Sequence, residues 1–206
     1  MADRNYIDTR GMSRLDWLKA RQRGIGGSDA AALILPPDVY KWHRPKDIYE
    51  DKTTERTDDS SPLTCEVGHY LEPFVAAKFT EVTGIRVHNL NRILLNPELP
   101  HMFANIDRKL YGANIGLEIK TTSAYNDRRF TEDTYPAEYY IQMQHYMAVT
   151  GWEKWYLAAL IGNHRFVWYE VPRSDEDIAE IIYIEKKFWD EIVVPRNEKE
   201  LEESWV

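Results

Sequence analysis

The order of the hydrophobic patterns constrains the fold of this chain more than any other feature of its sequence. Residues 85–121 contain short, roughly alternating segments separated by turn-forming residues, which is the period-2 pattern of β-strands. Helical patterns precede this stretch, and the order helix, strand, strand, helix follows it. This order predicts a mixed α/β fold with a central mixed β-sheet flanked by helices, not a regular βαβ repeat.

Caps and apolar stripes place the individual segments. We expect helices over residues 13–23, 30–35, 44–51, 62–83, 136–149 and 174–192. We expect strands within residues 85–96, 102–106, 115–121, 154–161 and 164–171. Pro73 lies inside the longest helix and predicts a kink or a restart there, with Val67, Leu71, Val75 and Val82 on one apolar face.

The segments without a pattern are expected to be polar connections. Residues 52–61 read as a surface loop, and residues 195–206 read as a polar tail. In the first helix, Leu15, Trp17 and Leu18 supply an apolar stripe.

The size and composition are those of an ordinary globular protein. The chain has 206 residues, of which 43% are hydrophobic and 29% charged, and this excludes a mostly disordered chain. We expect a single domain over residues 1–206. The one cysteine, Cys65, excludes an intrachain disulfide and Cys-rich metal sites, and we expect its thiol to be buried. The presence of a single cysteine indicates a reducing, cytoplasmic compartment.

Membranes are not expected as partners. The apolar runs are far too short to span a bilayer, and the first residues lack the apolar core of a signal peptide. The net charge of −8 argues against a protein that coats nucleic acid through bulk positive charge. A negative net charge is still compatible with local basic patches and with an enzyme whose carboxylates bind a metal ion.

One group of charged residues has the composition of a metal site. Glu118 and Lys120 lie two residues apart on a predicted strand, so both project to one face while Ile119 points into the core. A hairpin turning at Gly112 brings Asp107 beside Glu118. Two carboxylates and the Ile119 carbonyl form a hard-oxygen site suited to Mg²⁺ or Mn²⁺.

The neighbouring lysine and a third acidic residue extend this group. The Lys120 ammonium is placed to orient a water molecule or to stabilise developing phosphate charge, and Glu72 would add a carboxylate from the long helix. The alternative is that these residues form ordinary solvated cross-strand pairs, which occur in many sheets. Their spacing alone leaves both interpretations open.

Five segments together resemble the lambda-exonuclease or YqaJ-like viral recombinase family, within the PD-(D/E)xK nuclease superfamily. They are RQRGIGGSDAA at 21–31, GHYLEP at 68–73, MFANID at 102–107, LEIKT at 117–121, and YYIQMQHYM at 139–147 followed by VTG at 149–151. They occur in the family's order, and the core that bears them extends over about residues 14–170. The proline that gives the superfamily its name is Ile106 here, which weakens the signature without removing a ligand.

The resemblance implies roles for the matching acidic residues and the lysine. Asp107 and Glu118 would be the core metal ligands, together with the Ile119 backbone carbonyl. Lys120 would position or activate the attacking water. Glu72 would bind or orient at the side of a second metal ion. Mg²⁺ is the implied cofactor, with two ions in each active site and Mn²⁺ as a substitute.

Three further residues acquire roles in the same way. Gln142, in a Gln-x-x-x-Tyr pattern ending at Tyr146, would form hydrogen bonds in the active site. Arg21 and Ser28 would hold the 5′-terminal phosphate of DNA. The intervening glycines resemble an anion-binding nest that leads into a helix N-terminus. Taken alone, this glycine-rich stretch also fits a tight turn between two helices.

The resemblance implies a restriction-endonuclease-like core and a Mg²⁺-dependent, alkaline-exonuclease-type enzyme. Such an enzyme hydrolyses one strand of double-stranded DNA from a 5′-phosphorylated end in the 5′-to-3′ direction. It releases mononucleotides and leaves a 3′ single-stranded overhang for recombination. A ring-shaped homotrimer, a single-strand annealing partner, and a phage or prophage origin within a bacterial host cell are also implied.

Two alternatives remain at this point. One is an endonuclease or a RecB-like repair nuclease of the same superfamily, and cleavage of a closed circle would distinguish it. The other is a non-catalytic DNA-binding module on the same fold. The presence of Asp107, Glu118, Lys120 and Glu72 together argues against an inactive module.

Overall fold

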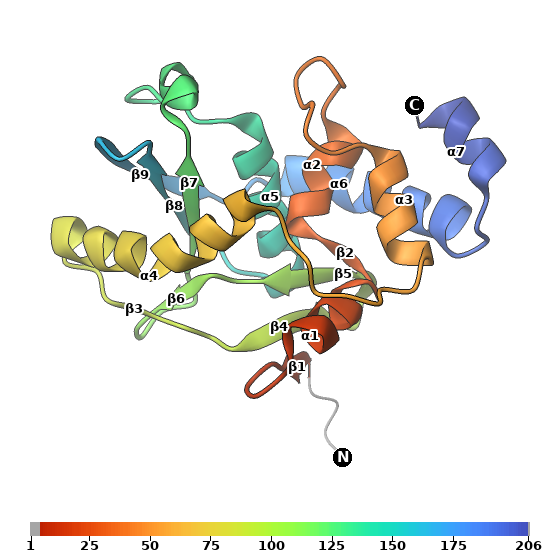
Figure 1. The fold of residues 1–206 in the computed structure, drawn as a ribbon, viewed down its shortest axis with the longest axis horizontal. Helices are drawn as coiled ribbons and strands as arrows, with labels where there is room; N and C mark the ends of the chain where they lie inside the picture. The colour runs from red at the N-terminus through yellow and green to blue at the C-terminus, as the bar shows by residue number, and fades with distance from the viewer. Residues whose placement is uncertain (1–4, 206) are drawn as a thin grey trace.

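Two mixed β-sheets, rather than one, form the centre of the molecule (Figure 1). The computed structural model describes residues 5–205. One sheet has the order β1 (Tyr6–Asp8), β4 (Arg92–Asn96), β5 (Leu99–Asn105), β2 (Ile25–Gly26). The other has the order β3 (Val87–His88), β6 (Arg108–Leu110), β7 (Gly116–Thr122), β8 (Lys154–Ile161), β9 (Arg165–Pro172). The mixed α/β class is confirmed, but the expectation of one central sheet is wrong.

The chain passes from the first sheet to the second over two residues. Strand β5 ends at Asn105 and β6 begins at Arg108, so that only Ile106 and Asp107 lie between the sheets. The predicted segment 85–96 also divides, because its first part pairs with β6 and its second part with β5. Strands of two or three residues carry too little alternation to be assigned from sequence.

Seven α-helices surround the sheets within residues 5–205. They are α1 (Arg14–Arg21), α2 (Gly27–Ile34), α3 (Pro45–Thr53), α4 (Leu63–Thr83), α5 (Ala137–Thr150), α6 (Asp175–Phe188) and α7 (Glu198–Ser204). A short 3₁₀-helix, Ala124–Arg129, follows β7, and a π-helical turn, Trp189–Val193, follows α6. No helix within residues 5–205 is long and apolar enough to cross a membrane.

Helix α7 lies in the segment expected to be a polar tail. The Asn197 side chain accepts a hydrogen bond from the Glu200 backbone N–H and caps the helix. Leu201 is buried, and the Trp205 ring packs against Phe188 at 5.0 Å between centroids. One apolar residue and one cap in a charged stretch give a weak pattern, which explains why the helix was not predicted.

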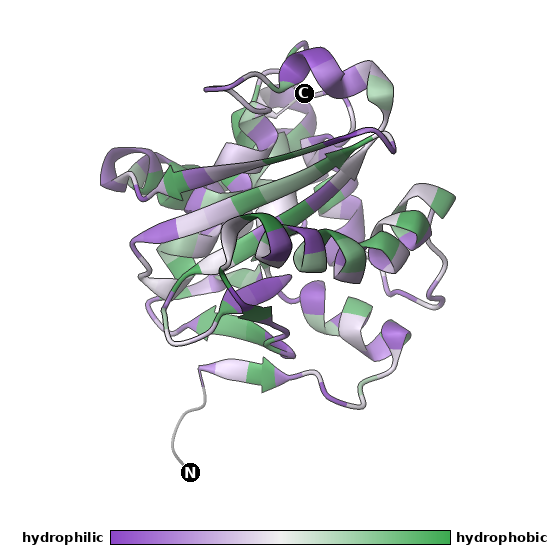
Figure 2. Ribbon diagram, turned by 90° about the vertical axis from the view of Figure 1, so that its left-hand side faces the viewer, coloured by the Kyte–Doolittle hydropathy of each residue, from purple (hydrophilic) through white to green (hydrophobic). Residues whose placement is uncertain are grey.

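Helices α4 and α5 cover opposite faces of the five-stranded sheet. Leu117 and Ile119 of β7 pack with Val75 and Phe79 of α4. On the other face, strand β8 contributes residues such as Trp155 to a core that includes Met143 and Met147 of α5. Hydrophobic segments run along the strands in Figure 2. The period-2 alternation along β7 therefore directs Glu118 and Lys120 toward α5.

Helix α4 differs from the predicted pattern in its apolar face. It is a single helix that contains Pro73, so of the two predicted effects of this proline the restart does not occur. Of its expected apolar face, only Val75 is fully buried, whereas Val67 and Val82 are exposed. The C-terminal half packs on the sheet. The N-terminal half lies beside a pocket, where it needs no apolar face.

Candidate active site

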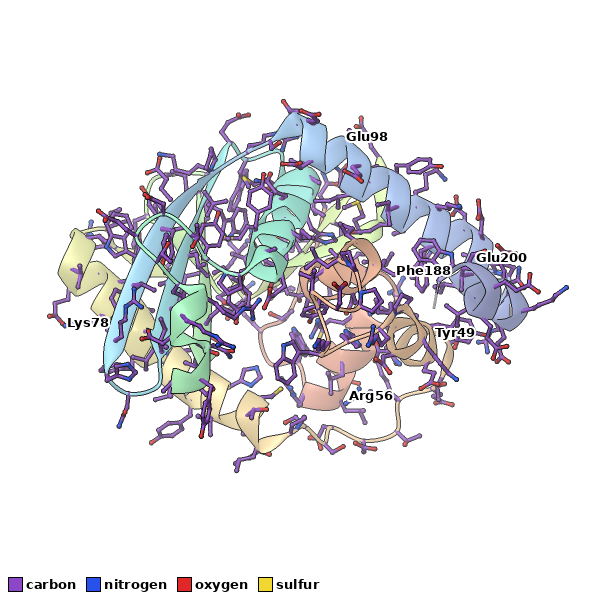
Figure 3. The ribbon with its side chains drawn as sticks, turned by 90° about the horizontal axis from the view of Figure 1, so that it is seen from above. Tyr49, Arg56, Lys78, Glu98, Phe188 and Glu200 are labelled. Carbon is purple, nitrogen blue, oxygen red and sulfur yellow. The ribbon has the colours of Figure 1, made fainter. Side chains whose placement is uncertain are left out.

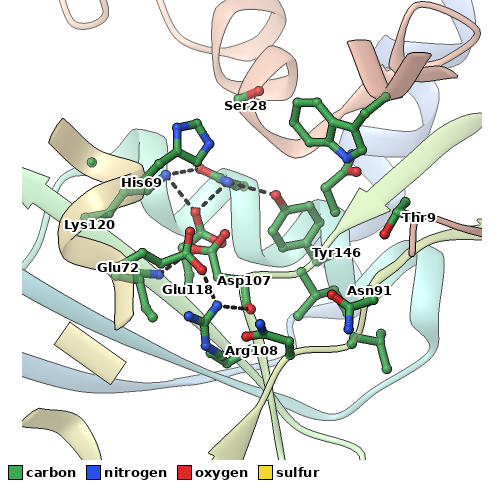
Figure 4. Close-up of a pocket in the computed structure, with 18 of the residues that line it drawn as sticks. Thr9, Ser28, His69, Glu72, Asn91, Asp107, Arg108, Glu118, Lys120 and Tyr146 are labelled. Carbon is green, nitrogen blue, oxygen red and sulfur yellow. Dashed lines mark hydrogen bonds and ion pairs between the residues drawn. The ribbon is translucent and has the colours of Figure 1, made fainter. Parts of the chain in front are cut away.

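The hairpin formed by β6 and β7 brings the two predicted acidic ligands together. Arg108 pairs with Leu117 and Lys109 with Gly116, so Asp107 comes just before the paired residues. The Asp107 Oδ2 atom accepts a hydrogen bond from the Ile119 backbone N–H at 2.8 Å. The predicted juxtaposition of Asp107 and the Glu118–Lys120 segment is therefore present, beside Glu72 of α4 (Figure 4).

Glu118 and Lys120 of β7 are connected to α5 by a short hydrogen-bond network. The Lys120 Nζ atom lies 2.7 Å from Glu118 Oε1 and donates to Gln142 Oε1 at 2.8 Å. The Gln142 amide donates in turn to Glu118 Oε1 at 2.7 Å and to the Tyr146 hydroxyl at 2.9 Å. Gln142 and Tyr146 are both buried, so α5 holds Glu118 and Lys120 in one geometry.

The electrostatics of this group follow from burial and from like charges held close together. Burial and the charges of Glu118 and Glu72 raise the pKa of Asp107 well above its ordinary value. Burial also raises the pKa of Glu118, although Lys120 opposes the shift. Burial alone would lower the pKa of Lys120, but Glu118 and Asp107 raise it above its ordinary value. Lys120 is therefore a firmly held cation at neutral pH.

Glu72 reaches the same pocket but is bound to another residue. Its carboxylate forms an ion pair with the Arg108 guanidinium, which also donates to the Asp107 backbone carbonyl at 2.7 Å. The Glu72 carboxylate, which is predicted to bind on the side of a second metal ion, is thus paired with Arg108 instead. Within residues 5–205, no three His, Cys, Asp or Glu side chains converge closely enough to hold a metal ion in this conformation.

The donor set nevertheless fits a divalent cation. The Glu118 Oε2 atom is buried, and no hydrogen-bond partner for it lies among residues 5–205. A buried carboxylate oxygen without a partner is costly, and the adjacent Asp107 raises that cost. A cation at this point would satisfy both carboxylates. Two carboxylates with a nearby backbone carbonyl are the oxygen ligands that Mg²⁺ prefers.

A second polar group lies where α1 approaches α2. The Arg21 Nη2 atom donates to the Ser28 hydroxyl at 3.2 Å. Asp29 accepts from the Gly26 backbone N–H at 3.0 Å and forms a buried ion pair with Lys52 at 2.9 Å. The predicted helix begins at residue 30, after Ser28 and Asp29. Helix α2 instead begins at Gly27, so both residues lie in its first turn.

The aromatic residue of α1 belongs to this group and not to the core. Two guanidinium groups lie over the Trp17 ring, with Arg14 at 5.0 Å and Arg21 at 4.8 Å from its centre. All three residues line the pocket. The predicted apolar stripe through Trp17 is therefore wrong. The spacing Arg14, Trp17, Arg21 places the three on one helical face, and that pattern was available in the sequence.

All the predicted site residues line one open pocket of about 510 Å³. They are Arg21, Ser28, Glu72, Asp107, Glu118, Ile119, Lys120 and Gln142. Helix α4 adds His69, whose Nδ1 atom lies 2.8 Å from the Cys65 backbone carbonyl. Cys65 also lines the pocket and is exposed, contrary to the expected buried thiol. Its position on the pocket side of α4 explains the difference.

The contact between α2 and α5 leads to a prediction about Gly27. An added Cβ there would lie 2.7 Å from a Tyr146 ring carbon and 2.9 Å from Gln142 Cγ. We expect Gly27→Ala to lower the free energy of unfolding by about 1–3 kcal/mol, because the buried side chains must move. Urea denaturation measures this change.

Gly68 on α4 provides a matched control. Its added Cβ would lie 3.5 Å from Thr121 Oγ1, an ordinary contact, and Gly68 is in a helix interior. We expect Gly68→Ala to raise stability by about 0.4–1 kcal/mol. Equal destabilisation by both substitutions would show that close packing at Gly27 is not the cause.

Comparison with known proteins places the chain in a family. The model of the YqaJ-like viral recombinase domain matches residues 16–153. The chain belongs to this family. The uncharacterized protein YqaJ of Bacillus subtilis strain 168 is 39% identical over 186 residues, which cover 89% of this chain. The chain spans only 57% of the length of YqaJ.

Solved structures show which fold this YqaJ-like chain has. The alkaline exonuclease LHK-Exo from Laribacter hongkongensis, in complex with dAMP, aligns with a TM-score of 0.69 and 21% identity, covering 91% of this chain and 96% of its own. A phage-related exonuclease from Haemophilus somnus 129PT aligns with a TM-score of 0.62 and 12% identity, covering 87% and 99%. The YqaJ-like chain therefore has the alkaline exonuclease fold.

Proposed function

We propose that this chain is a Mg²⁺-dependent exonuclease that degrades one strand of double-stranded DNA from a 5′-phosphorylated end, in the 5′-to-3′ direction. The observation that carries the proposal is that two chemically distinct groups share one pocket. Asp107, Glu118 and Lys120 form an acidic centre with a fixed cation. Arg21 and Ser28 form a polar pair suited to a phosphate. The viral recombinase family and the alkaline exonuclease fold support this function.

Asp107, Glu118 and the Ile119 carbonyl are the proposed ligands of Mg²⁺, for which Mn²⁺ would substitute. When bound, a pair of such ions would supply a nucleophilic water near neutral pH and neutralise charge on the scissile phosphate. Glu72 is the proposed ligand on the side of the second ion. It must first leave Arg108, which then becomes available to a phosphate.

Lys120 works as a hydrogen-bond donor and a fixed positive charge. An ammonium has three N–H donors, and Glu118 and Gln142 use two of them. The third is left for the attacking water or a phosphate oxygen. A donor that is already oriented stabilises the charge that develops during phosphodiester cleavage. Gln142 keeps Lys120 in this orientation.

Arg21 and Ser28 are the proposed ligands of the 5′-terminal phosphate. Ser28 is exposed in the first turn of α2, where the helix dipole favours an anion. The Trp17 ring restrains the Arg21 guanidinium by stacking. A terminal phosphate held there would fix which phosphodiester bond reaches Asp107 and Glu118.

The remaining parts of the proposal follow the family resemblance. The products would be mononucleotides and a 3′ overhang, used in recombination of the phage type. A homotrimeric ring and a single-strand annealing protein would be the partners, in the cytoplasm of a bacterial host. A phage or prophage would be the source of the gene.

One digestion assay tests the activity. We expect Mg²⁺ to support mononucleotide release from linear duplexes with 5′-phosphate ends, and a chelator to stop it. Duplexes with 5′-hydroxyl ends should be degraded more slowly. Arg21→Gln should lower kcat/KM on phosphorylated ends by about 10- to 100-fold, because a hydrogen bond to a charged group is worth about 1.5–3 kcal/mol.

The same assay separates the alternatives. Equal rates from hydroxyl and phosphate ends would contradict the roles of Arg21 and Ser28 while leaving the nuclease in place. Cleavage of a covalently closed circle would show an endonuclease. Binding of duplex without hydrolysis under any divalent cation would show a non-catalytic module.

A further inference from the structure

A second groove lies on the other side of helix α1 from the candidate active site. It has a volume of about 660 Å³ and is formed by α1, the C-terminal end of α3 and the π-helical turn. We call it the α1–α3 groove. The residues that matter for its chemistry are Lys19, Arg23, Lys52, Glu55, Trp189 and Arg196. The last two lie beyond residues 16–153, which the family model matches.

The groove is strongly basic within an acidic protein. It presents four cationic side chains and one carboxylate, Glu55, although the whole chain carries a net charge of −8. The charge of Lys52 is compensated by two ion pairs, with Asp29 at 2.9 Å and with Asp51 at 3.0 Å.

The other three cations have no acidic partner in the part of the chain that the structure describes. Within residues 5–205, no carboxylate lies within 4.0 Å of the charged atoms of Lys19, Arg23 or Arg196. Three unpaired cations around one groove indicate an anionic ligand.

The backbone at Arg196 also points to a specific role. Its φ is +56°, a conformation that residues other than glycine rarely adopt. Asparagine and glycine occupy it more easily, so an arginine at this point is unusual. The Asn197 N–H donates to the Ile192 carbonyl at 3.0 Å and holds the turn in place. The turn thereby keeps an arginine on the wall of the groove.

Helix α1 connects the groove to the candidate active site. Its Arg14, Trp17 and Arg21 line the active-site pocket, whereas its Lys19 and Arg23, two residues after its end, line the groove. An anion that occupies both must cross a helix about 10–12 Å wide. A nucleic-acid strand has the necessary length and carries a phosphate at each nucleotide.

We propose that the α1–α3 groove binds the sugar–phosphate backbone of the DNA substrate, away from the bond that is cleaved. This inference rests on the proposed function, because DNA must first reach the active-site pocket. The groove extends the contact beyond the terminal nucleotides. It reads no base sequence, since cations on a phosphate backbone position DNA without specifying it.

The test compares a short and a long ligand on one triple variant, Lys19→Gln, Arg23→Gln, Arg196→Asn. Asparagine is chosen at 196 because it tolerates the left-handed backbone. Fluorescence anisotropy in a chelator measures binding of a 5′-phosphorylated dinucleotide and of a 5′-phosphorylated 20-base-pair duplex without hydrolysis. The dinucleotide is too short to span α1.

The expected result is selective for length. Duplex affinity should fall at least about tenfold at 0.1 M salt, and the slope of log K against log salt should decrease by about 2–3. Dinucleotide binding should stay unchanged. The control variant, Lys78→Gln, Lys154→Gln, Lys199→Gln, loses the same charge outside both pockets and should bind duplex like the wild type. Figure 3 shows Lys78 at the left edge of the molecule, away from Arg56, the neighbour of Glu55.

Several outcomes would overturn the inference. If both triple variants lose duplex affinity to the same extent, the loss of charge matters and the groove does not. If the groove variant binds duplex like the wild type, the groove takes no part in binding. If the groove variant also loses the dinucleotide, its cations act on the active-site pocket through α1. If the wild type binds polyglutamate, and the groove variant loses only that ligand, the groove serves an acidic polypeptide. A wild type that binds no DNA at all would instead refute the proposed function.

Discussion

Glu118→Gln should lower kcat for DNA hydrolysis by about 10³-fold while leaving DNA binding nearly unchanged. Glutamine keeps the size of the side chain and its hydrogen bond to Gln142, but it removes the negative charge that Lys120 faces. Loss of one pre-oriented electrostatic group in an active site typically costs about 10²- to 10³-fold in rate. Asp107→Asn should have a similar effect, because Asp107 belongs to the same charged centre.

Binding and hydrolysis must be measured separately to read this result. Anisotropy with a 5′-phosphorylated duplex reports binding, and single-turnover digestion in Mg²⁺ reports the chemical step. Glu98→Gln is the matched control, since it makes the same change on the exposed turn between β4 and β5. A Glu118→Gln enzyme with activity within threefold of the wild type would refute the proposed centre.

The largest effect on stability is expected at a buried pair behind the site. His145 of α5 and Glu185 of α6 are both fully buried, with His145 Nδ1 2.8 Å from Glu185 Oε1. The Nε2 atom lies 3.0 Å from the Phe103 carbonyl. Both ring nitrogens therefore face acceptors, an arrangement that a doubly protonated imidazolium satisfies. The pair joins α5, α6 and β5.

Breaking this pair on one side should be costly. We expect His145→Leu to lower the free energy of unfolding by about 3–5 kcal/mol, because Glu185 becomes a buried charge without a partner. The double variant His145→Leu/Glu185→Leu should recover most of that loss. Urea denaturation of both single variants and the double variant gives the coupling energy. Additive effects would contradict a direct interaction.

The pair should also make stability depend on pH. Burial alone would lower the pKa of His145, but Glu185 and the Phe103 carbonyl raise it above its ordinary value of about 6.5. A folded-state pKa that is raised means that the histidine contributes its stabilisation below about pH 6.5. That contribution is lost as the pH rises through the raised value. The double variant should lack this part of the pH dependence.

The local parts of the candidate site could be predicted from the sequence. Asp107 and Glu118 meet because one short hairpin sets their register, and Gly112 supplies the turn with a φ of +72°. The alternation along β7 then fixes which side Glu118 and Lys120 share. Each of these relations spans only a dozen residues, so periodicity and turn chemistry determine them.

The parts that depend on distant contacts could not be predicted. The division into two sheets is set by pairings such as that of Ile25 with Met102, which no local pattern reveals. The ion pair between Glu72 and Arg108 joins two elements that are 36 residues apart. The sequence places Arg14, Trp17 and Arg21 on one helical face, but only the surrounding fold shows that this face lines the pocket instead of the core.

The two-residue link between β5 and β6 ties the chemistry to the integrity of the whole fold. Asp107 belongs to neither sheet, whereas Glu118 is anchored in one of them. Loosening of one sheet against the other would move Ser28, which follows β2 of the first sheet, away from Asp107 and Glu118 before either sheet melted. Inactivation by heat or mild denaturant should therefore precede unfolding. A fragment that keeps only the five-stranded sheet would retain Asp107, Glu118 and Lys120 on the β6–β7 hairpin but would lack Arg21 and Ser28.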